Sequence, residues 1–370
     1  MTNKPYGTVE NKTDKDNHSR FGLDQDYDSK FSKSLLLWYE QNARILPWRE
    51  NPEPYRVWVS EIMLQQTQVL TVLPYFERFI QALPEIKDLA LAEESKILKL
   101  WEGLGYYNRV RNMQKTARIL INQFDGKLPE DYELLLKLPG IGAYTAGAIA
   151  SIAFNKRKAA IDGNVLRVFS RVTGSYEDIE KPAIKVEFQN LALKLQPINR
   201  PGDFNQALME LGAKICLPKA APLCTRCPLS SLCIAYRDQT TGEIPVKTTK
   251  KKRKLEMRSI LIIRTNEQVL LRQRPEKGLL AGLWEPLNIE GFTSEEGVLE
   301  ILEELGLYPL SIRRIEHAKH LFTHIEWQLQ GYLVEIMEAK PPEGFIFAGR
   351  EAIKNEITLP KAFKAYIKYL

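Results

Sequence analysis

Apolar residues recur at the spacing of an α-helix through most of the chain, and this pattern stops near residue 259. It is clearest in four segments: Leu35–Leu46, Val57–Phe79, Ile97–Leu104 and Thr145–Phe154. Beyond it, Ser259–Arg264 and Gln268–Gln273 predict short strands around a turn. Ser294–Leu305 then predicts a helix that follows Thr293 as its N-cap and ends at Gly306. The sequence therefore predicts a multidomain chain, with an all-α domain followed by a smaller α+β domain.

Composition divides the chain further. We expect a disordered polar tail over residues 1–30, the helical domain over 31–237, a basic linker over 238–257 and the second domain over 258–370. The linker contains the basic run 250–254, which reads Lys-Lys-Lys-Arg-Lys. This run fits a solvated linker, a contact with DNA phosphates or a nuclear-import signal, and the sequence leaves all three open.

The charge of the chain is uneven. Of the net charge of +6, residues 258–370 carry −2 and residues 1–257 carry +8. A positive first domain is consistent with a polyanionic partner but does not identify one.

No apolar stretch approaches the ~18 residues of a membrane span. The first thirty residues also lack the apolar core of a secretory signal, so we expect neither a membrane protein nor a secreted one.

All four cysteines fall in one short run, spaced Cys216-x7-Cys224-x2-Cys227-x5-Cys233. A disulfide scaffold would spread its cysteines along the chain, so this clustering indicates a metal site in a reducing compartment. A compact run of four thiolates suits a [4Fe–4S] cluster, in which each iron takes one cysteine. Zinc is the alternative, although zinc ribbons usually use two Cys-x2-Cys pairs and this run has one.

The segment Leu138–Ala146 joins two apolar helices through Pro-Gly-x-Gly. Gly140 and Gly142 permit a tight turn with exposed backbone N–H groups beside the positive end of the second helix. Such a turn can bind an anion such as a DNA phosphate. An ordinary helix-to-helix turn is the other interpretation.

Two carboxylates stand near this hairpin in the sequence. Asp162 follows it within Ile161–Val165, where an acid at a turn is usually a cap or a surface group. Glu61 lies one helical turn past Val57. If Val57 and Trp58 point inward, Glu61 enters an apolar setting that would raise its pKa and keep it protonated as a general acid. A solvated helix glutamate is the alternative.

Six segments together resemble the MutY-type adenine DNA glycosylases, in that family's order over roughly residues 35–330. They are Leu46–Arg49, Ser60–Val69, Trp101–Tyr107, the hairpin at 132–154, Asp162–Val165 and Phe204–Ala207. The resemblance implies an all-α helix-hairpin-helix glycosylase domain with a [4Fe–4S] loop at 216–233, followed by an α+β MutT/Nudix-like domain. The implied activity is base-excision repair, by hydrolysis of the N-glycosidic bond of adenine mispaired with 8-oxoguanine or guanine.

The resemblance also implies roles for individual residues. Glu61 would protonate adenine, Asp162 would support the sugar cation, and Tyr144 would stand beside them in the catalytic centre. The adenine pocket would be lined by Arg44, Trp48, Leu64 and Gln206. The opposite base, or the gap left by the flipped base, would be met by Gln66, Thr67, Leu104 and Tyr106.

Tyr144 separates this chain from the related lyases. Proteins resembling endonuclease III have a lysine nucleophile at that position, and their later aspartate stands in an Asp-Thr-His context instead of Asp162-Gly163-Asn164. Without that amine no Schiff base forms with the sugar, so we expect a monofunctional glycosylase. The alternatives are a bifunctional lyase for damaged pyrimidines, a non-catalytic DNA-binding scaffold and a Nudix hydrolase fusion.

The second domain resembles the MutT-like module that ends MutY proteins. Leu299–Leu307 is similar to half of a Nudix box, but Leu299 replaces its arginine, and Glu285 and Gly291 occupy its upstream positions. We therefore expect no magnesium-dependent hydrolysis of nucleotides. Phe322, Thr323 and His324 match the family's Phe-Ser-His loop, which reads 8-oxoguanine, with Thr323 in place of serine. A zinc site at His317, His320 and His324 lacks a further strong ligand.

The expected partner is double-stranded DNA with A:8-oxoG or A:G mismatches, bound by a monomer in the bacterial cytoplasm at the nucleoid.

One departure from the family concerns the cysteine loop. Its first gap, Leu217–Leu223, has seven residues where the family usually has six. This change removes no ligand but alters the loop that precedes Cys224.

Overall fold

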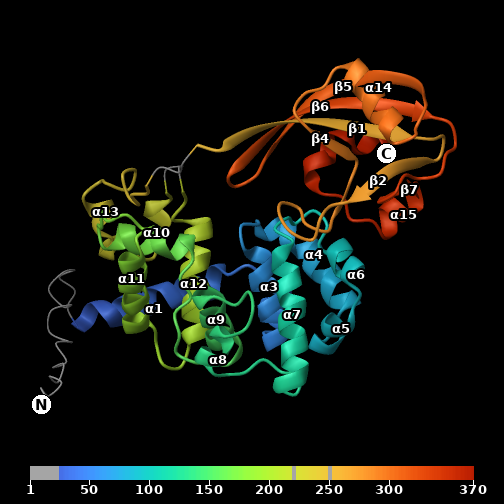
Figure 1. Cartoon of the computed structure of the whole chain (residues 1–370). Coiled ribbons are helices and arrows are strands. Elements are labelled where there is room, and N and C mark those ends of the chain that lie inside the picture. Colours follow the sequence, from blue (N-terminus) through green and yellow to red (C-terminus); the bar gives the residue numbers. More distant parts are fainter. Residues whose placement is uncertain (1–24, 219–221, 249–251) are drawn as a thin grey trace, which may run out of the picture. The chain divides into compact units, whose positions relative to one another are not determined.

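A computed structural model of the chain describes residues 25–218, 222–248 and 252–370, and within them two compact units (Figure 1). The first unit contains residues 25–58, 129–137 and 141–248. The second contains residues 59–128 and 138–140 together with the C-terminal part of the chain. Both units include part of the helical region, because α3 (Pro54–Leu64) begins in the first and ends in the second.

The first unit is helical. Its α-helices are α1 (Gln25–Asn42), α2 (Pro47–Glu50), α8 (Tyr132–Leu136), α9 (Ala143–Ala148), α10 (Gly163–Val172), α11 (Pro182–Leu195), α12 (Pro201–Lys214) and α13 (Ile234–Arg237). A π-helical turn, Ile149–Ala153, continues α9, and two 3₁₀ turns, Cys224–Arg226 and Ser230–Leu232, lie in the cysteine loop. Its core contains Phe31, Phe169, Phe188 and Phe204, all essentially unexposed.

Helices α10 and α12 pack closely because a glycine stands at their contact. A Cβ atom added at Gly212 would lie 2.6 Å from the Cβ of Asn164. This spacing is shorter than any real Cβ contact, so a larger residue at 212 would displace Asn164. The close approach brings α12 next to the N-terminal turn of α10, where Asp162 stands.

The second unit begins with four further helices, which are α4 (Val69–Ala82), α5 (Ile86–Leu91), α6 (Glu94–Leu100) and α7 (Asn108–Gln123). Its C-terminal part is a seven-stranded mixed sheet. The strands are β1 (Lys254–Arg264), β2 (Gln268–Gln273), β3 (Trp284–Glu285), β4 (Leu287–Glu290), β5 (Pro309–Leu321), β6 (Ile325–Ile336) and β7 (Phe345–Gly349).

The sheet runs in the order β3-β2-β1-β6-β5, with β4 also paired to β1 and β7 to β2. The β1–β6 pair is parallel, and the other pairs are antiparallel. Side chains of β1 alternate between two cores. Ile260 and Ile262 pack with Phe363 from the 3₁₀ helix Lys361–Tyr369, whereas Leu261 packs with Val298 of α14 (Glu295–Glu304). A last helix, α15 (Arg350–Asn355), follows β7.

The predicted fold class is confirmed, with several local differences. Residues 25–30, expected in the polar tail, form the first turns of α1, and residues 1–24 lie outside the described part of the chain. Strand β1 starts at Lys254, inside the predicted linker, because its pairing with β6 extends to Lys254↔Ile325. Ser294, rather than Thr293, caps α14 by accepting from the Gly297 N–H.

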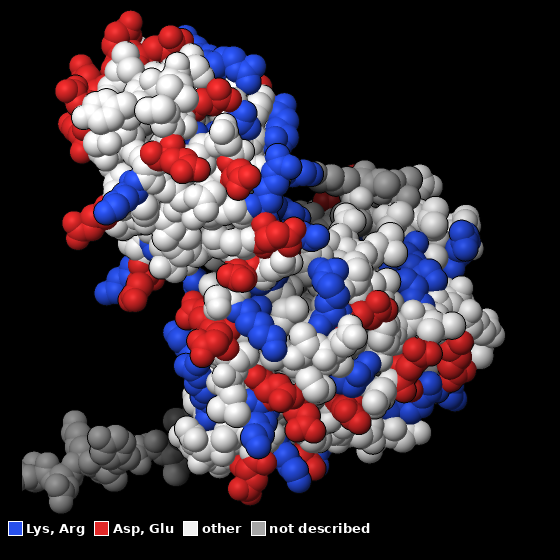
Figure 2. Space-filling model, turned by 90° about the vertical axis from the view of Figure 1, so that its right-hand side faces the viewer, with Lys and Arg blue, Asp and Glu red and all other residues white. Residues whose placement is uncertain are grey.

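Charged side chains show no single dominant sign on the face drawn in Figure 2, where basic and acidic residues are interspersed. The net positive charge of residues 1–257 is therefore not gathered into one patch on that face. None of the described helices is both long and apolar enough to span a bilayer.

Candidate active site

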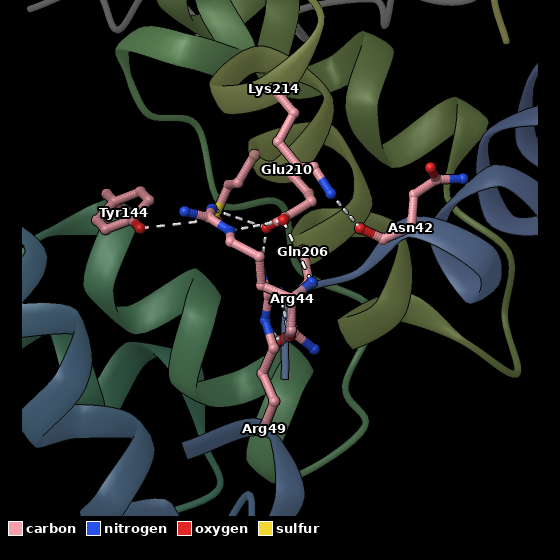
Figure 3. A network of polar contacts seen from close by, with 8 residues as sticks. Asn42, Arg44, Arg49, Tyr144, Gln206, Glu210 and Lys214 are labelled. Atoms are coloured by element: carbon pink, nitrogen blue, oxygen red, sulfur yellow. Dashed lines mark hydrogen bonds and ion pairs between the residues drawn. The ribbon is translucent and has the colours of Figure 1, made fainter. Parts of the chain in front are cut away.

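A buried carboxylate organises one end of the first unit (Figure 3). Glu210 of α12 is unexposed and accepts two hydrogen bonds from the Arg44 side chain, at 2.7 Å from Nε and 2.9 Å from Nη2, and one from the Arg44 backbone N–H at 3.3 Å. Arg49 of α2 adds a fourth at 2.9 Å from Nη2. Burial by itself would raise the pKa of Glu210, but the hydrogen bonds and charges of the two arginines outweigh it and hold the pKa below its ordinary value.

The same cluster orients a predicted pocket residue. Arg49 Nε lies 3.0 Å from Oε1 of Gln206, which stands one turn before Glu210 on α12. Because a guanidinium only donates, the contacting atom must be the amide oxygen. Gln206 therefore offers its NH₂ group, a donor, to any other partner.

Two more predicted residues lie in this unit. Trp48 is buried within α2, between Arg44 and Arg49 in sequence. The Tyr144 hydroxyl, on α9, donates to the sulfur of Met209 on α12 at 3.6 Å, and Figure 3 shows its ring facing that helix. Four predicted residues, Arg44, Trp48, Tyr144 and Gln206, thus belong to one unit.

Asp162 is the N-cap of α10. Its Oδ1 accepts from the backbone N–H groups of Asn164 and Val165 at 2.9 and 2.7 Å, and its Oδ2 accepts from Asn164 Nδ2 at 2.7 Å. The interpretation as a helix cap is therefore correct in structural terms. Burial nevertheless raises the pKa of the carboxyl, against the lowering effect of these hydrogen bonds.

A chain of hydrogen bonds joins Asp162 to the cysteine loop. Asn164, whose amide nitrogen contacts Asp162, accepts at its Oδ1 from Arg167 Nη2 at 2.9 Å. Arg167 Nε then donates to the backbone oxygen of Cys216 at 2.7 Å. Arg171, one turn later, donates to the Cys216 sulfur at 3.3 Å. Three hydrogen bonds in series thus connect Asp162 with the first residue of the cysteine loop.

Glu61 lies in the part of α3 that belongs to the second unit. It is 5% exposed, and its neighbours Ile62 and Met63 are also buried, as is Trp58. The solvated interpretation of this glutamate is therefore excluded. Leu64, the last residue of α3, is half-buried.

The helix predicted over Val57–Phe79 is interrupted at Gln65–Gln68, between α3 and α4. Arg109 of α7 explains the interruption. Its Nη1 donates to the carbonyls of Ile62, Met63 and Gln65, at 2.7 to 3.1 Å. Its Nη2 donates to the carbonyls of Leu104 and Gly105, at 3.2 and 3.0 Å. One half-buried guanidinium therefore holds both loops that carry the predicted opposite-base residues.

These loops have unusual backbone conformations. Gln66 has φ +58° and Tyr106 has φ +49°, values that residues other than glycine seldom adopt. Gln66 and Tyr106 are exposed, and Thr67 is half-buried. Leu104 is buried, at 7% exposed, so in this structure it does not project into solvent.

In the turn of the hairpin, only Gly140 needs to be glycine. It has φ +79°, whereas Gly142 has φ −90° and caps α9 in an extended conformation open to other residues. Both are exposed. The first helix of the hairpin, α8, ends at Leu136.

The second unit places the predicted 8-oxoguanine loop next to Tyr106. The Thr323 and Tyr106 hydroxyl oxygens are 3.0 Å apart. Phe322 has two contacts that fix its position. Its ring centroid lies 4.9 Å from that of Trp327, and its backbone carbonyl accepts a hydrogen bond from Arg253 Nε at 2.8 Å. Residues 320–325, Tyr106, Arg109 and Gln65 line a cavity of about 570 Å³.

Two of the three histidines of this region pack on different aromatic rings. His317 packs on Phe292 and His320 on Phe322, with ring centroids 6.0 and 4.5 Å apart. Glu285, at the upstream Nudix position, is buried and bound by Arg272, Arg274 and Asn288. The Glu285 carboxylate is therefore occupied by hydrogen bonds to side chains of its own domain.

Comparisons with known proteins agree with this geometry. The HhH-GPD superfamily of base excision DNA repair proteins matches residues 59–193, and the NUDIX domain family matches residues 259–369. Adenine DNA glycosylase of Mus musculus is 38% identical, over 84% of this chain and 71% of its own length. Adenine DNA glycosylase of Buchnera aphidicola (from Schizaphis graminum) is 37% identical, over 83% and 88%.

This chain belongs to the MutY-type adenine DNA glycosylase family.

Solved structures support the glycosylase fold. A thermostable thymine-DNA glycosylase aligns with a TM-score of 0.52 and 31% identity, over 57% of this chain and 97% of its own. A trapped endonuclease III–DNA complex aligns with a TM-score of 0.51 over 59% and 99%, and at 22% identity it shows the fold alone.

The cysteine loop of this glycosylase fits a [4Fe–4S] cluster. Its four cysteines line one cavity with Arg171 and Leu229, and none forms a disulfide. Within the described ranges, no three His, Cys, Asp or Glu side chains close on a single ion. Four thiols around one cavity are the ligand set that a [4Fe–4S] cluster takes, with one cysteine for each iron. Residues 219–221, within the lengthened gap, are outside the described ranges.

No role in the site was predicted from the sequence for Glu210 or Arg49.

Glu210→Gln should lower the unfolding free energy of this glycosylase by about 3 kcal/mol, because two half-buried guanidinium groups would lose their anion. Urea unfolding followed by circular dichroism measures the effect. Asp203→Asn, which removes only a half-exposed partner of Arg200, is the matched control and should cost less than about 1 kcal/mol. Equal midpoints for the two variants would contradict a stabilising role for the cluster.

Proposed function

We propose that this glycosylase excises adenine from duplex DNA in which adenine is paired with 8-oxoguanine or guanine, and leaves the DNA strand intact. The observation that carries the proposal is the Glu210 cluster. It presents the Gln206 amide as a donor, beside Arg44, whose Nη1 is not engaged by Glu210. Adenine has ring nitrogens that accept hydrogen bonds, so donors fixed in this way suit its recognition.

Glu61 is the proposed acid. Its burial on α3 keeps bulk water away from the carboxyl, which suits a group that passes a proton directly to a bound base. In the proposed reaction Glu61 transfers that proton to a ring nitrogen of the flipped adenine. The bond between N9 and the sugar C1′ then breaks, and its electron pair leaves with the base.

Asp162 is the proposed partner of the sugar cation. Burial raises the pKa of its carboxyl, so the ionised form is less stable in the free protein than in water. A positive charge developing at C1′ would stabilise that ionised form in the transition state. Water then adds to C1′, loses a proton to solvent or to the Glu61 carboxylate, and leaves an abasic site.

DNA binding is proposed for the hairpin turn. Gly140 and Gly142 are exposed, and the turn leads into the N-terminal end of α9. Exposed N–H groups at a helix start suit a phosphate of the backbone. The glycines would let that phosphate approach the chain closely.

The activity test uses duplexes that contain A:8-oxoG, A:G, A:C or thymine glycol. We expect adenine release from the first two and product strands that break only after treatment with alkali, since Tyr144 cannot form a Schiff base. Glu61→Gln keeps the shape without the proton and should be about 10²–10⁴-fold slower while still binding the duplex. Strand breaks without alkali, or release from thymine glycol alone, would sink the proposal.

The Phe322–His324 loop is the proposed reader of the opposite base. Oxidation turns N7 of guanine from an acceptor into a donor and adds a carbonyl at C8. The Thr323 hydroxyl can accept from N7–H or donate to O8. Its exposure and its contact with Tyr106 support this role.

Thr323→Val should lower the preference for A:8-oxoG over A:G by about tenfold to a hundredfold, because a methyl group would leave a polar atom of the base unpaired at a loss of about 1–3 kcal/mol. Thr323→Ser should keep the preference. Single-turnover excision on both duplexes measures it. If the valine and serine variants show the same preference for A:8-oxoG over A:G, the Thr323 hydroxyl is not the group that recognises 8-oxoguanine.

A [4Fe–4S] cluster is the proposed cofactor, held by Cys216, Cys224, Cys227 and Cys233. When bound it would supply a rigid, negatively charged centre for the loop. The chain's own contribution is Arg171, which already donates to the Cys216 sulfur.

Protein purified without oxygen should be yellow-brown and contain about four irons per chain. Metal analysis and the visible spectrum measure this, with Cys224→Ala as a variant that should lose iron. One zinc per chain and a colourless protein would contradict the cluster.

A further inference from the structure

Lys99 on α6 uses all three of its ammonium hydrogens. It donates to the Ile353 carbonyl at 2.8 Å, the Ile357 carbonyl at 3.0 Å and Oε2 of Glu102 at 2.6 Å. Ile353 lies in α15, and Ile357 follows that helix. The last carbonyls of a helix lack partners within it and form its negative end, so a cation is well placed there.

Glu102, in the turn that follows α6, makes the complementary contact. Its second oxygen, Oε1, accepts from the Leu359 N–H at 2.7 Å. The pair therefore presents one cation to carbonyls and one anion to an N–H. Its side chains are 18% and 29% exposed, so both charges are largely withdrawn from water.

The segment held by this pair belongs to the core of the second domain. Ile357, Leu359, Ala362 and Phe363 are buried in the cluster that covers one face of the sheet. Trp284, on β3, also donates its backbone N–H to the Thr358 carbonyl at 3.3 Å. A displacement of residues 357–359 would therefore also displace the sheet, because these residues are packed against it and hydrogen-bonded to it.

The contact also bears on the Thr323–Tyr106 pair in the same unit. Tyr106 stands four residues after Glu102, in the loop held by Arg109. Arg111 of α7 makes a further contact with the second domain, through the Ala281 carbonyl at 2.8 Å. Residues 360–362, directly after the Lys99–Glu102 contact, and residues 278–281 line the same cavity as Thr323.

We propose that Lys99 and Glu102 are positioning residues, which seat residues 258–370 on α6 and thereby set how well the glycosylase tells 8-oxoguanine from guanine. The second part of this statement rests on the proposed function. Neither Lys99 nor Glu102 lines the cavity that Thr323 lines, so the pair acts through the placement of Thr323 and not by touching DNA.

Swapping the two charges distinguishes this role from an ordinary helix ion pair. Lys99→Glu combined with Glu102→Lys keeps two opposite charges three residues apart, and a plain ion pair would tolerate the exchange. In the proposed arrangement the swap puts a carboxylate against two carbonyls and an ammonium against an N–H. The double variant should therefore behave as badly as Lys99→Met.

Two measurements on the full-length protein test the proposal. Hydrogen exchange of residues 353–363 reports the seating, and we expect Lys99→Met and the double variant to raise its rate by about tenfold. Single-turnover excision on A:8-oxoG and A:G duplexes reports the reading, and we expect the ratio of the two rate constants to fall by about tenfold. The A:G rate constant should stay within about twofold of wild type. Lys96→Met, an exposed residue one turn earlier, should change none of these values.

The ratio is insensitive to partial unfolding, because both rate constants come from one preparation. Unchanged exchange in the variants would overturn the seating. Faster exchange with an unchanged ratio would overturn the link to discrimination, as would a double variant that recovers the wild-type ratio. If wild type itself shows no preference for 8-oxoguanine, the proposed reading function has failed, and that result is visible before any variant is measured.

Discussion

A buried carboxylate cannot stay ionised in a protein interior without cations, and Glu210 meets this requirement with Arg44 and Arg49. The requirement joins distant parts of the chain, since the arginines precede Glu210 by more than 160 residues. It fixes the connection between α1 and α2 against α12. Arg49 donates through Nη2 to Glu210 and through Nη1 to the Arg44 carbonyl, and its Nε donates to Gln206.

In the second unit the organising group is a cation, the guanidinium of Arg109, and its partners are backbone carbonyls. Arg109 donates to five backbone carbonyls, three at the end of α3 and in the turn that follows it and two in the loop before α7. Two residues in strained conformations, Gln66 and Tyr106, are retained because this guanidinium fixes the backbone around them. In both units, residues that the family resemblance assigns to DNA are supported by arginines that it does not assign.

Local signals in the sequence predicted much of this structure. The range Gln268–Gln273 for β2 needs no correction, and the change from helical to strand texture separates the helical region from the sheet. Strand β5 was not predicted, because most of its thirteen residues are exposed and show no simple alternation. The interruption at Gln65–Gln68 was missed because no glycine or proline marks it, and its cause lies on α7. Glu210 was missed for a related reason, since a glutamate within a helix resembles a solvated one until its partners are known.

Asp162 serves as the cap of α10 as well as a candidate for chemistry, and this double use affects the fate of any covalent intermediate. The N-terminal end of a helix favours an anion over a neutral group. An ester between Asp162 and the sugar would be neutral, and α10 would lose part of its cap for as long as the ester lasted. The helix would thus favour return of the free carboxylate and would keep such an adduct short-lived.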